Sequence, residues 1–191
     1  MAKTSKRRGR SSEEEDVHTH LSIRVKHYDA RVNASINHEI YNQRGSWTIE
    51  NDPVYHFTTQ LTITGISTYP EERAGDTYEL TIQGGDVPSR GHDVKLKDLQ
   101  ARDEHGSLRY RTYHGKDVPI YDRPQDLGLL NKIRGESRWT GWLFAPTEFV
   151  RDMLILLSHG RDFFLALHER RSGRTRWIHG MSLQTNDPTE E

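Results

Sequence analysis

The chain contains no cysteine, few apolar residues and no long apolar run. The absence of cysteine excludes disulfides, thiol nucleophiles, and cysteine-ligated zinc or iron–sulfur centres. The longest strongly apolar stretch, Met153 to Leu157, is far shorter than the roughly 20 residues that a membrane-spanning helix needs. The basic start, 1–10, is followed by serines and acidic residues rather than by the apolar segment of a signal peptide. We therefore expect a soluble, cytoplasmic protein with no membrane contact.

Charge is balanced, with 27 basic and 28 acidic side chains and a net charge of −1. No global field therefore attracts nucleic acid or a membrane surface. A length of 191 residues predicts a single domain, which we place at 17–185. Residues 1–16 divide into a basic and an acidic half with little apolar content, so we expect a disordered charged tail. Residues 186–191 are polar and predict a frayed tail.

The strong catalytic motifs are missing. The sequence contains no P-loop, no dinucleotide-binding GxGxxG, no GxSxG elbow and no acidic calcium loop. His38 and Glu39 begin like a zinc-protease motif, but Asn42 stands where the second histidine belongs. We therefore expect no cofactor, and the sequence favours a non-catalytic chain over an enzyme.

Apolar residues alternate with polar ones through most of the chain, which predicts strands with one buried face. The clearest segments are 21–26, 55–64 and 77–83, and weaker ones are 32–40, 94–100 and 108–113. Near the C-terminal end, further strands are expected at 139–144, 163–168 and 177–183. Apolar residues at three- and four-residue steps predict one α-helix near 147–158, ended by Gly160. The fold class is mostly β: an antiparallel β-sandwich or open β-barrel of about 8–10 strands with that one helix.

Turn residues connect these segments. Residues 171–174 predict a tight hairpin between the last two strands, and 103–107 another short connection. Gly84 to Gly91 predicts a longer, flexible loop. The two prolines within 118–125 predict an irregular crossing segment.

Histidine is the one residue type in excess, with eleven copies. His18 and His20 project from the same face of any strand they join, and such a pair can hold a metal ion with a third ligand from a neighbouring strand. Surface histidines without a ligand are the alternative. His168 and Glu169 precede a hairpin and His179 follows it, and a pairing across this hairpin predicts a histidine–carboxylate unit for general acid–base chemistry. The alternative is that these side chains only pack.

Two clusters of basic and aromatic residues suit nucleic acid or another anion. The first surrounds the last hairpin: Arg170, Arg171, Arg174, Arg176 and Trp177. If it lies beside Trp139 and Trp142, an arginine- and tryptophan-rich face results. The second is Arg109 and Arg111, which alternate with Tyr110 and Tyr113. In both cases a charged strand edge and core aromatics are the alternative.

Three functions follow from these patterns. The missing catalytic motifs favour a non-catalytic binding or assembly domain, with a protein partner or a second copy of the chain. The alternative is a nucleic-acid-associated protein that uses the basic tail and the Arg/Trp hairpin face. A His-dependent metal enzyme on a β-barrel is the third possibility.

Overall fold

A computed structural model describes residues 16–36, 54–85 and 95–188 of the chain. The described elements, in chain order, are β1 (Val17–Ile36), β2 (Tyr55–Tyr69), η1 (Glu71–Arg73), β3 (Thr77–Gly84), η2 (Leu96–Leu99), β4 (Tyr110–Tyr113), β5 (Lys116–Pro119), β6 (Gly128–Lys132), β7 (Arg138–Ala145), α2 (Thr147–Leu157), β8 (Phe164–Ser172) and β9 (Thr175–Gln184), where η marks a short 3₁₀ helix. The prediction of a mostly β fold with one α-helix is confirmed for these residues.

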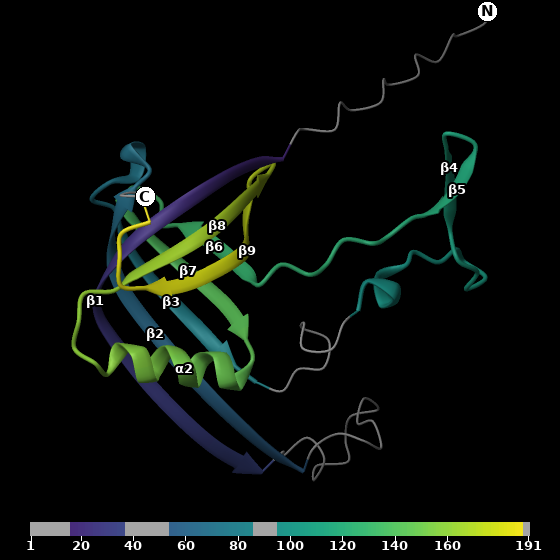
Figure 1. Cartoon of the computed structure of the whole chain (residues 1–191). Helices are drawn as coiled ribbons and strands as arrows, with labels where there is room; N and C mark the ends of the chain where they lie inside the picture. The colour runs from purple at the N-terminus through teal and green to yellow at the C-terminus, as the bar shows by residue number, and fades with distance from the viewer. Residues whose placement is uncertain (1–15, 37–53, 86–94, 189–191) are drawn as a thin grey trace, which may run out of the picture.

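Seven strands form a closed barrel in the order β1-β2-β3-β7-β6-β9-β8 (Figure 1). All neighbours pair antiparallel except β3 and β7, which run parallel. The barrel is thus closed rather than open, because β1 pairs with β2 along one edge and with β8 along the other. It is mixed rather than purely antiparallel, because the chain leaves the barrel after β3 and re-enters at β6, next to β7.

The barrel interior is filled by alternate residues of its strands. Leu61, Ile63, Leu80 and Ile82 are all fully buried, while the residues between them face outward or are half-buried. Gly141 on β7 leaves room for this core, since a Cβ there would lie 2.5 Å from a methyl of Leu80. Because each strand contributes only one face, 32% apolar residues suffice for a continuous core.

The helix α2 covers the end of the barrel at which β3 finishes. Val150, Met153 and Leu157 face the core, while Ile155 and Leu156 are exposed. This is the three- and four-residue stripe that the sequence predicted, and the helix bounds agree with that prediction. Gly160 has a φ of 68°, the left-handed conformation that glycine adopts at lowest cost.

Other local predictions have mixed outcomes. The hairpin at 171–174 is confirmed, because Ser172 pairs with Thr175. The segment 94–100 is not a strand: Leu96–Leu99 is a 3₁₀ helix whose first turn is capped by the Asp98 carboxylate, which accepts the backbone N–H of Lys95 at 2.8 Å. The structure also contains β5 and β6, which the sequence analysis missed. The loop predicted at Gly84 to Gly91 lies mostly outside the described residues.

β4 and β5 form a separate two-stranded sheet that lies away from the barrel (Figure 1). Its base is held by backbone hydrogen bonds between Ala101 and Ile120 and between Arg109 and Ala101, both 2.8 Å. We call residues 95–122 the β4–β5 arm. Within the described residues, no helix is long and apolar enough to span a membrane.

The helix offers a matched pair of substitutions that tests its packing. We expect Leu157→Ala to lower the free energy of unfolding by about 2–5 kcal/mol, because it leaves a cavity under the barrel end. Leu156→Ala removes the same atoms from an exposed position and is expected to cost about 0.5 kcal/mol or less. Urea denaturation measures both, and equal losses would contradict the placement of α2.

Candidate functional site

β1 and β2 are longer than the barrel that they help to close. The pairing of β1 with β8 covers Val17 to Arg24 and ends there, whereas its pairing with β2 continues to Ile36. Beyond Thr59, where the pairing of β2 with β3 also ends, the two strands run on past α2 as a two-stranded ribbon (Figure 1). We call Lys26–Ile36 together with Tyr55–Leu61 the β1–β2 ribbon.

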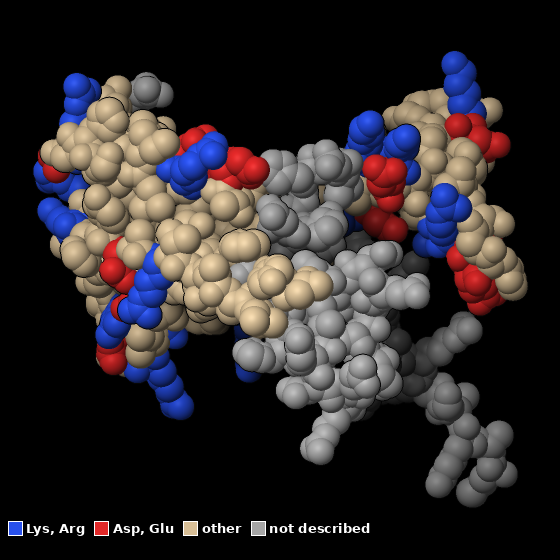
Figure 2. All heavy atoms as spheres, turned by 90° about the horizontal axis from the view of Figure 1, so that it is seen from below, with Lys and Arg blue, Asp and Glu red and all other residues tan. Residues whose placement is uncertain are grey.

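One face of the β1–β2 ribbon continues the barrel core. Directly paired residues of an antiparallel sheet share a face, and Leu61, which is paired with Ala30, is fully buried in the core. The same face further out carries Val32, Ala34, Ile36, Tyr55 and Phe57. Val32 is 81% exposed and Phe57 is 68% exposed. In the view from below, the end of the ribbon projects from the barrel and carries mostly uncharged side chains (Figure 2).

The opposite face of the ribbon is polar. It carries Asp29, Arg31 and Asn33 on β1, opposite threonine and glutamine side chains of β2. The outer edge of β1 from Lys26 to Ile36 pairs with no other strand in the part of the chain that the structure describes. The ribbon therefore combines an exposed apolar face with a row of backbone groups that face solvent, which is the edge that a further strand can join.

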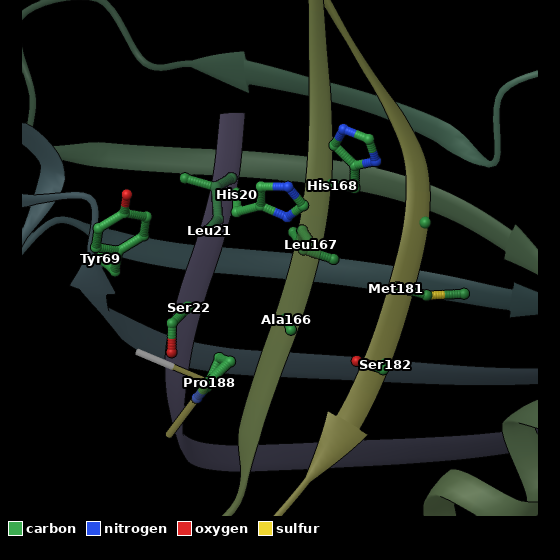
Figure 3. A pocket seen from close by; sticks show the side chains of 11 residues that line it. His20, Leu21, Ser22, Tyr69, Ala166, Leu167, His168, Met181, Ser182 and Pro188 are labelled. Atoms are coloured by element: carbon green, nitrogen blue, oxygen red, sulfur yellow. The ribbon is translucent and has the colours of Figure 1, made fainter. Parts of the chain in front are cut away.

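A second candidate site is a groove on the outer wall of the barrel, over β1, β8 and β9 (Figure 3). It has a volume of about 550 Å³, and small side chains such as Ser22, Ala166 and Ser182 line it. At one end stand His20 and His168, which are paired across the strands and stacked with ring centroids 4.6 Å apart. Tyr69 also borders the groove.

Four imidazoles gather beside this groove: His18, His20, His168 and His179. Nδ1 of His18 and Nε2 of His168 share a hydrogen bond of 3.2 Å, and the ring centroids of His168 and His179 lie 5.5 Å apart. The bulge in the β8–β9 pairing at His168/Glu169 leaves His179 without a directly paired residue on β8. We call these four residues the histidine cluster.

The metal site predicted at His18 and His20 gains His168 as a neighbour. However, within the described ranges no group of three or more His, Asp or Glu side chains is arranged to hold a metal ion. His20 and His168 are stacked, and His18 is hydrogen-bonded to His168 rather than turned toward a shared point. The metal site therefore stays a prediction without support from this arrangement.

The general acid–base unit predicted from His168, Glu169 and His179 is divided between two faces. His168 and His179 come together outside the barrel, while Glu169 is fully buried inside it. The carboxylate next to His179 is that of Asp126, 3.3 Å from Nε2. Adjacent strand residues point to opposite faces, which is why His168 and Glu169 do not meet.

The surroundings of two members of the histidine cluster, His168 and His179, favour neutral imidazoles. Burial lowers the pKa of His168, and the neighbouring His20 and His18 lower it further. Burial also lowers the pKa of His179; Asp126 opposes this effect, whereas Arg123 and Arg170 add to it. Nε2 of His179 accepts a hydrogen bond of 2.9 Å from Arg170 Nε, and that bond requires an unprotonated Nε2.

Glu169 is the centre of a buried ion cluster at the barrel end opposite α2. Its carboxylate accepts two hydrogen bonds from Arg73, at 2.7 and 3.0 Å, and another from Arg176. Both guanidinium groups lie over the ring of Trp139, at 4.7 and 5.1 Å from its centroid. Burial would raise the pKa of Glu169, but the hydrogen bonds and charges of the two arginines outweigh it and the pKa is lowered.

The arginines predicted to bind nucleic acid are dispersed. Arg170 is buried and bonded to Asp16 at 3.1 Å and Asp126 at 2.9 Å. Arg176 is bonded to Glu169. Arg171 and Arg174 are exposed at the β8–β9 hairpin. Arg109 and Arg111 are exposed on the β4–β5 arm, in a different sheet.

The two tryptophan regions do become neighbours. Trp177 and Trp142 each pair with Leu129 of β6, so all three residues lie in a row on the outer face. Together with Phe144 and Asp126 they line a second hollow, of about 450 Å³. Trp139, by contrast, belongs to the core at 3% exposure. The face is therefore aromatic, but its arginines are largely bonded elsewhere.

Sequence reasoning missed the β1–β2 ribbon, although its signal was present. Tyr28, Ala30 and Val32 alternate with polar residues, but one residue out of phase with the preceding segment, so the pattern predicts two strands, at 21–26 and 32–40. Only the pairing shows that one strand runs through both segments and that part of it lies beyond the barrel.

The buried ion cluster makes a sharp stability prediction. We expect Glu169→Gln to lower the free energy of unfolding by about 3–5 kcal/mol, because two arginines lose their buried counter-charge. Glu79→Gln is the matched control: Glu79 pairs with Arg138 at 2.5 Å, but both side chains are over 40% exposed, and the cost should be about 1 kcal/mol or less. Chemical denaturation distinguishes the two, and a small loss for Glu169→Gln would contradict the cluster.

The histidine cluster predicts a loss of stability in mild acid. Because the pKa values of His168 and His179 are lowered from about 6.5, the unfolded chain binds more protons than the folded one below that pH. The free energy of unfolding should therefore fall between about pH 7 and pH 5.5, above the range in which carboxylates titrate. His168→Gln should flatten this dependence, while His159→Gln, outside the cluster, should leave it unchanged. A pH series of urea melts tests this, and an unchanged slope in His168→Gln would refute it.

Comparison with known proteins adds no assignment. No family model matches the chain, and no match is found among curated proteins or among solved structures. The function of this chain has therefore to be argued from its own residues and fold.

Proposed function

We propose that the chain is a non-catalytic binding and assembly domain that holds a partner polypeptide along the β1–β2 ribbon. The observation that carries this proposal is the ribbon's exposed apolar face, with Val32 at 81% and Phe57 at 68% exposure. The partner is an extended strand that joins the outer edge of β1 and places apolar side chains beside this face.

The free-energy balance of the ribbon supports this function. Two-stranded ribbons are marginally stable in water on their own. This one extends beyond the barrel with its apolar face in solvent, and burying apolar surface yields about 25 cal/mol per Å². A strand added to β1 also satisfies backbone N–H and C=O groups along Lys26–Ile36, and the pattern of side chains on the two faces then sets its register.

The arrangement of the arginines favours this proposal over nucleic-acid binding. A phosphate-binding face needs guanidinium groups that are free to bond phosphate oxygens. Arg170 and Arg176 already bond carboxylates, and replacing those bonds with phosphate contacts would cost Asp126 and Glu169 one arginine partner each. Nucleic-acid binding would rest on Arg171, Arg174 and the β4–β5 arm.

Photo-crosslinking from the ribbon tests the proposal. We expect Val32→p-benzoylphenylalanine, on the apolar face, to crosslink to protein when the chain is irradiated in its native host. The same substitution at Thr58, on the polar face of β2, is the control and should give no crosslink. Mass spectrometry of the crosslinked peptides identifies the partner strand. No crosslink from position 32, or equal crosslinking from both positions, would overturn the assembly function.

A further inference from the structure

We infer that the partner strand is the β1 edge of a second copy of this chain, paired antiparallel and centred on Ala30. This inference rests on the proposed function and names its partner. A two-fold axis through the midpoint between the two Ala30 residues then joins the β1 edges of two barrels into one continuous sheet, in which β3, β2 and β1 of one copy are followed by β1, β2 and β3 of the other. The paired stretch, Lys26 to Ala34, lies within the edge that pairs with no strand among the described residues.

The charges next to Ala30 are self-complementary. Asp29 and Arg31 lie on the same polar face, 3.3 Å apart, and both are more than half exposed. A symmetric interface requires that if residue i faces residue j, then j faces i. Pairing about Ala30 places Asp29 of each copy directly opposite Arg31 of the other. Two cross-strand ion pairs result, in the arrangement in which opposite charges stabilise a sheet.

Neighbouring symmetric registers lack this match. If the pairing is centred on Arg31, the two Arg31 side chains face each other. If it is centred on Asp29, the two Asp29 side chains face each other. Both registers therefore place like charges side by side. Centring on Val32 leaves both charges opposite uncharged residues. The Ala30 register is therefore the one that the charge pattern selects.

The apolar face also gains from this register. Tyr28 of each copy lies directly opposite Val32 of the other, and the two Ala30 residues face each other between them. All these residues lie on the face that continues the core, because a two-fold axis perpendicular to the sheet keeps both apolar faces on one side. The far end of each ribbon is carried toward the barrel of the other copy. The apolar side chains along the two β1 edges therefore contact one another across the new strand pair.

The absence of cysteine makes a direct test possible, since a single introduced thiol has no competitor. In the proposed register the two Ala30 Cα atoms lie about 4.5–5.5 Å apart, within the range that a disulfide spans. We expect Ala30→Cys to form a disulfide-linked dimer of twice 22.2 kDa under mild oxidation. Val32→Cys is the matched control: its two copies lie four residues out of register, about 14 Å apart, and should stay unlinked. Equal linking of both variants, or linking through position 32 alone, would overturn the register.

Charge exchange tests the interface without a covalent bond. Asp29→Arg alone and Arg31→Asp alone each place like charges opposite one another twice, and we expect at least about a tenfold weaker dimer by sedimentation equilibrium. An equimolar mixture of the two single variants restores opposite charges and should form a dimer as tight as wild type. A wild-type chain that stays monomeric, or a mixture no tighter than the separate variants, would overturn the inference. Both substitutions replace exposed side chains, and circular dichroism is the control that tests whether each variant is folded.

The outcomes separate this inference from the proposed function. If position 32 crosslinks to a different protein and Ala30→Cys stays unlinked, the assembly function stands and the second copy is wrong. If neither position 32 nor Ala30→Cys gives a linked product, both are wrong. If Ala30→Cys is linked and the crosslink from position 32 maps to Tyr28 or its neighbours, both are supported.

Discussion

The pairing of β1 with β8 ends at Arg24, and the shape of the molecule depends on that limit. Up to this residue β1 has a neighbour on each edge and contributes Leu21 and Ile23 to the core. Beyond it, β1 pairs only with β2 among the described strands; a bulge between Val25 and His27 shifts the alternation by one residue, and Tyr28, Ala30 and Val32 then lie on the core face. The height of a barrel is set by the stretch over which all its strands pair, and β3 and β7 have only eight residues each. The extra length of β1 and β2 therefore becomes a ribbon whose apolar face has no counterpart inside the barrel.

The two ends of the barrel are closed by opposite means. α2 closes one end with apolar side chains, while Glu169, Arg73 and Arg176 close the other with charge. A buried ion cluster of this kind contributes little net stability compared with an apolar core, because the desolvation of three charges offsets their attraction. It does require particular partners: Arg73 comes from the η1 turn and Arg176 from the β8–β9 hairpin, and both must reach the same carboxylate over Trp139. The cluster therefore fixes how two connections fold over the barrel mouth.

Local periodicity predicted much of the fold. The helix, the last hairpin and most strands were visible as three-to-four-residue or two-residue repeats, because these patterns are caused by the faces that are buried. The closure of the barrel could not be predicted from the sequence, because it depends on the pairing of β1 with β8, which are separated by about 150 residues of chain. The histidine cluster could be predicted in pairs, His18 with His20 and His168 with His179, but not as one group. The partners of Arg170 and Arg176 were hidden for the same reason: Asp16 and Asp126 are remote in sequence, and Glu169 points to the face opposite that of its neighbour His168.

A charged strand edge is usually a defence against unwanted pairing, and the β1 edge meets that description with Lys26, Asp29 and Arg31. A neutral strand that paired there would desolvate an aspartate and an arginine without offering either a partner. A strand avoids that cost if an acidic residue precedes a basic one by two positions, because antiparallel pairing then places each charge opposite its counter-charge. A second copy of the chain always carries this pattern in the required order. Asp29 and Arg31 therefore disfavour pairing with strands that lack this pattern and favour pairing with a second copy of the chain. One pair of residues thus both limits unwanted pairing at the β1 edge and selects the partner.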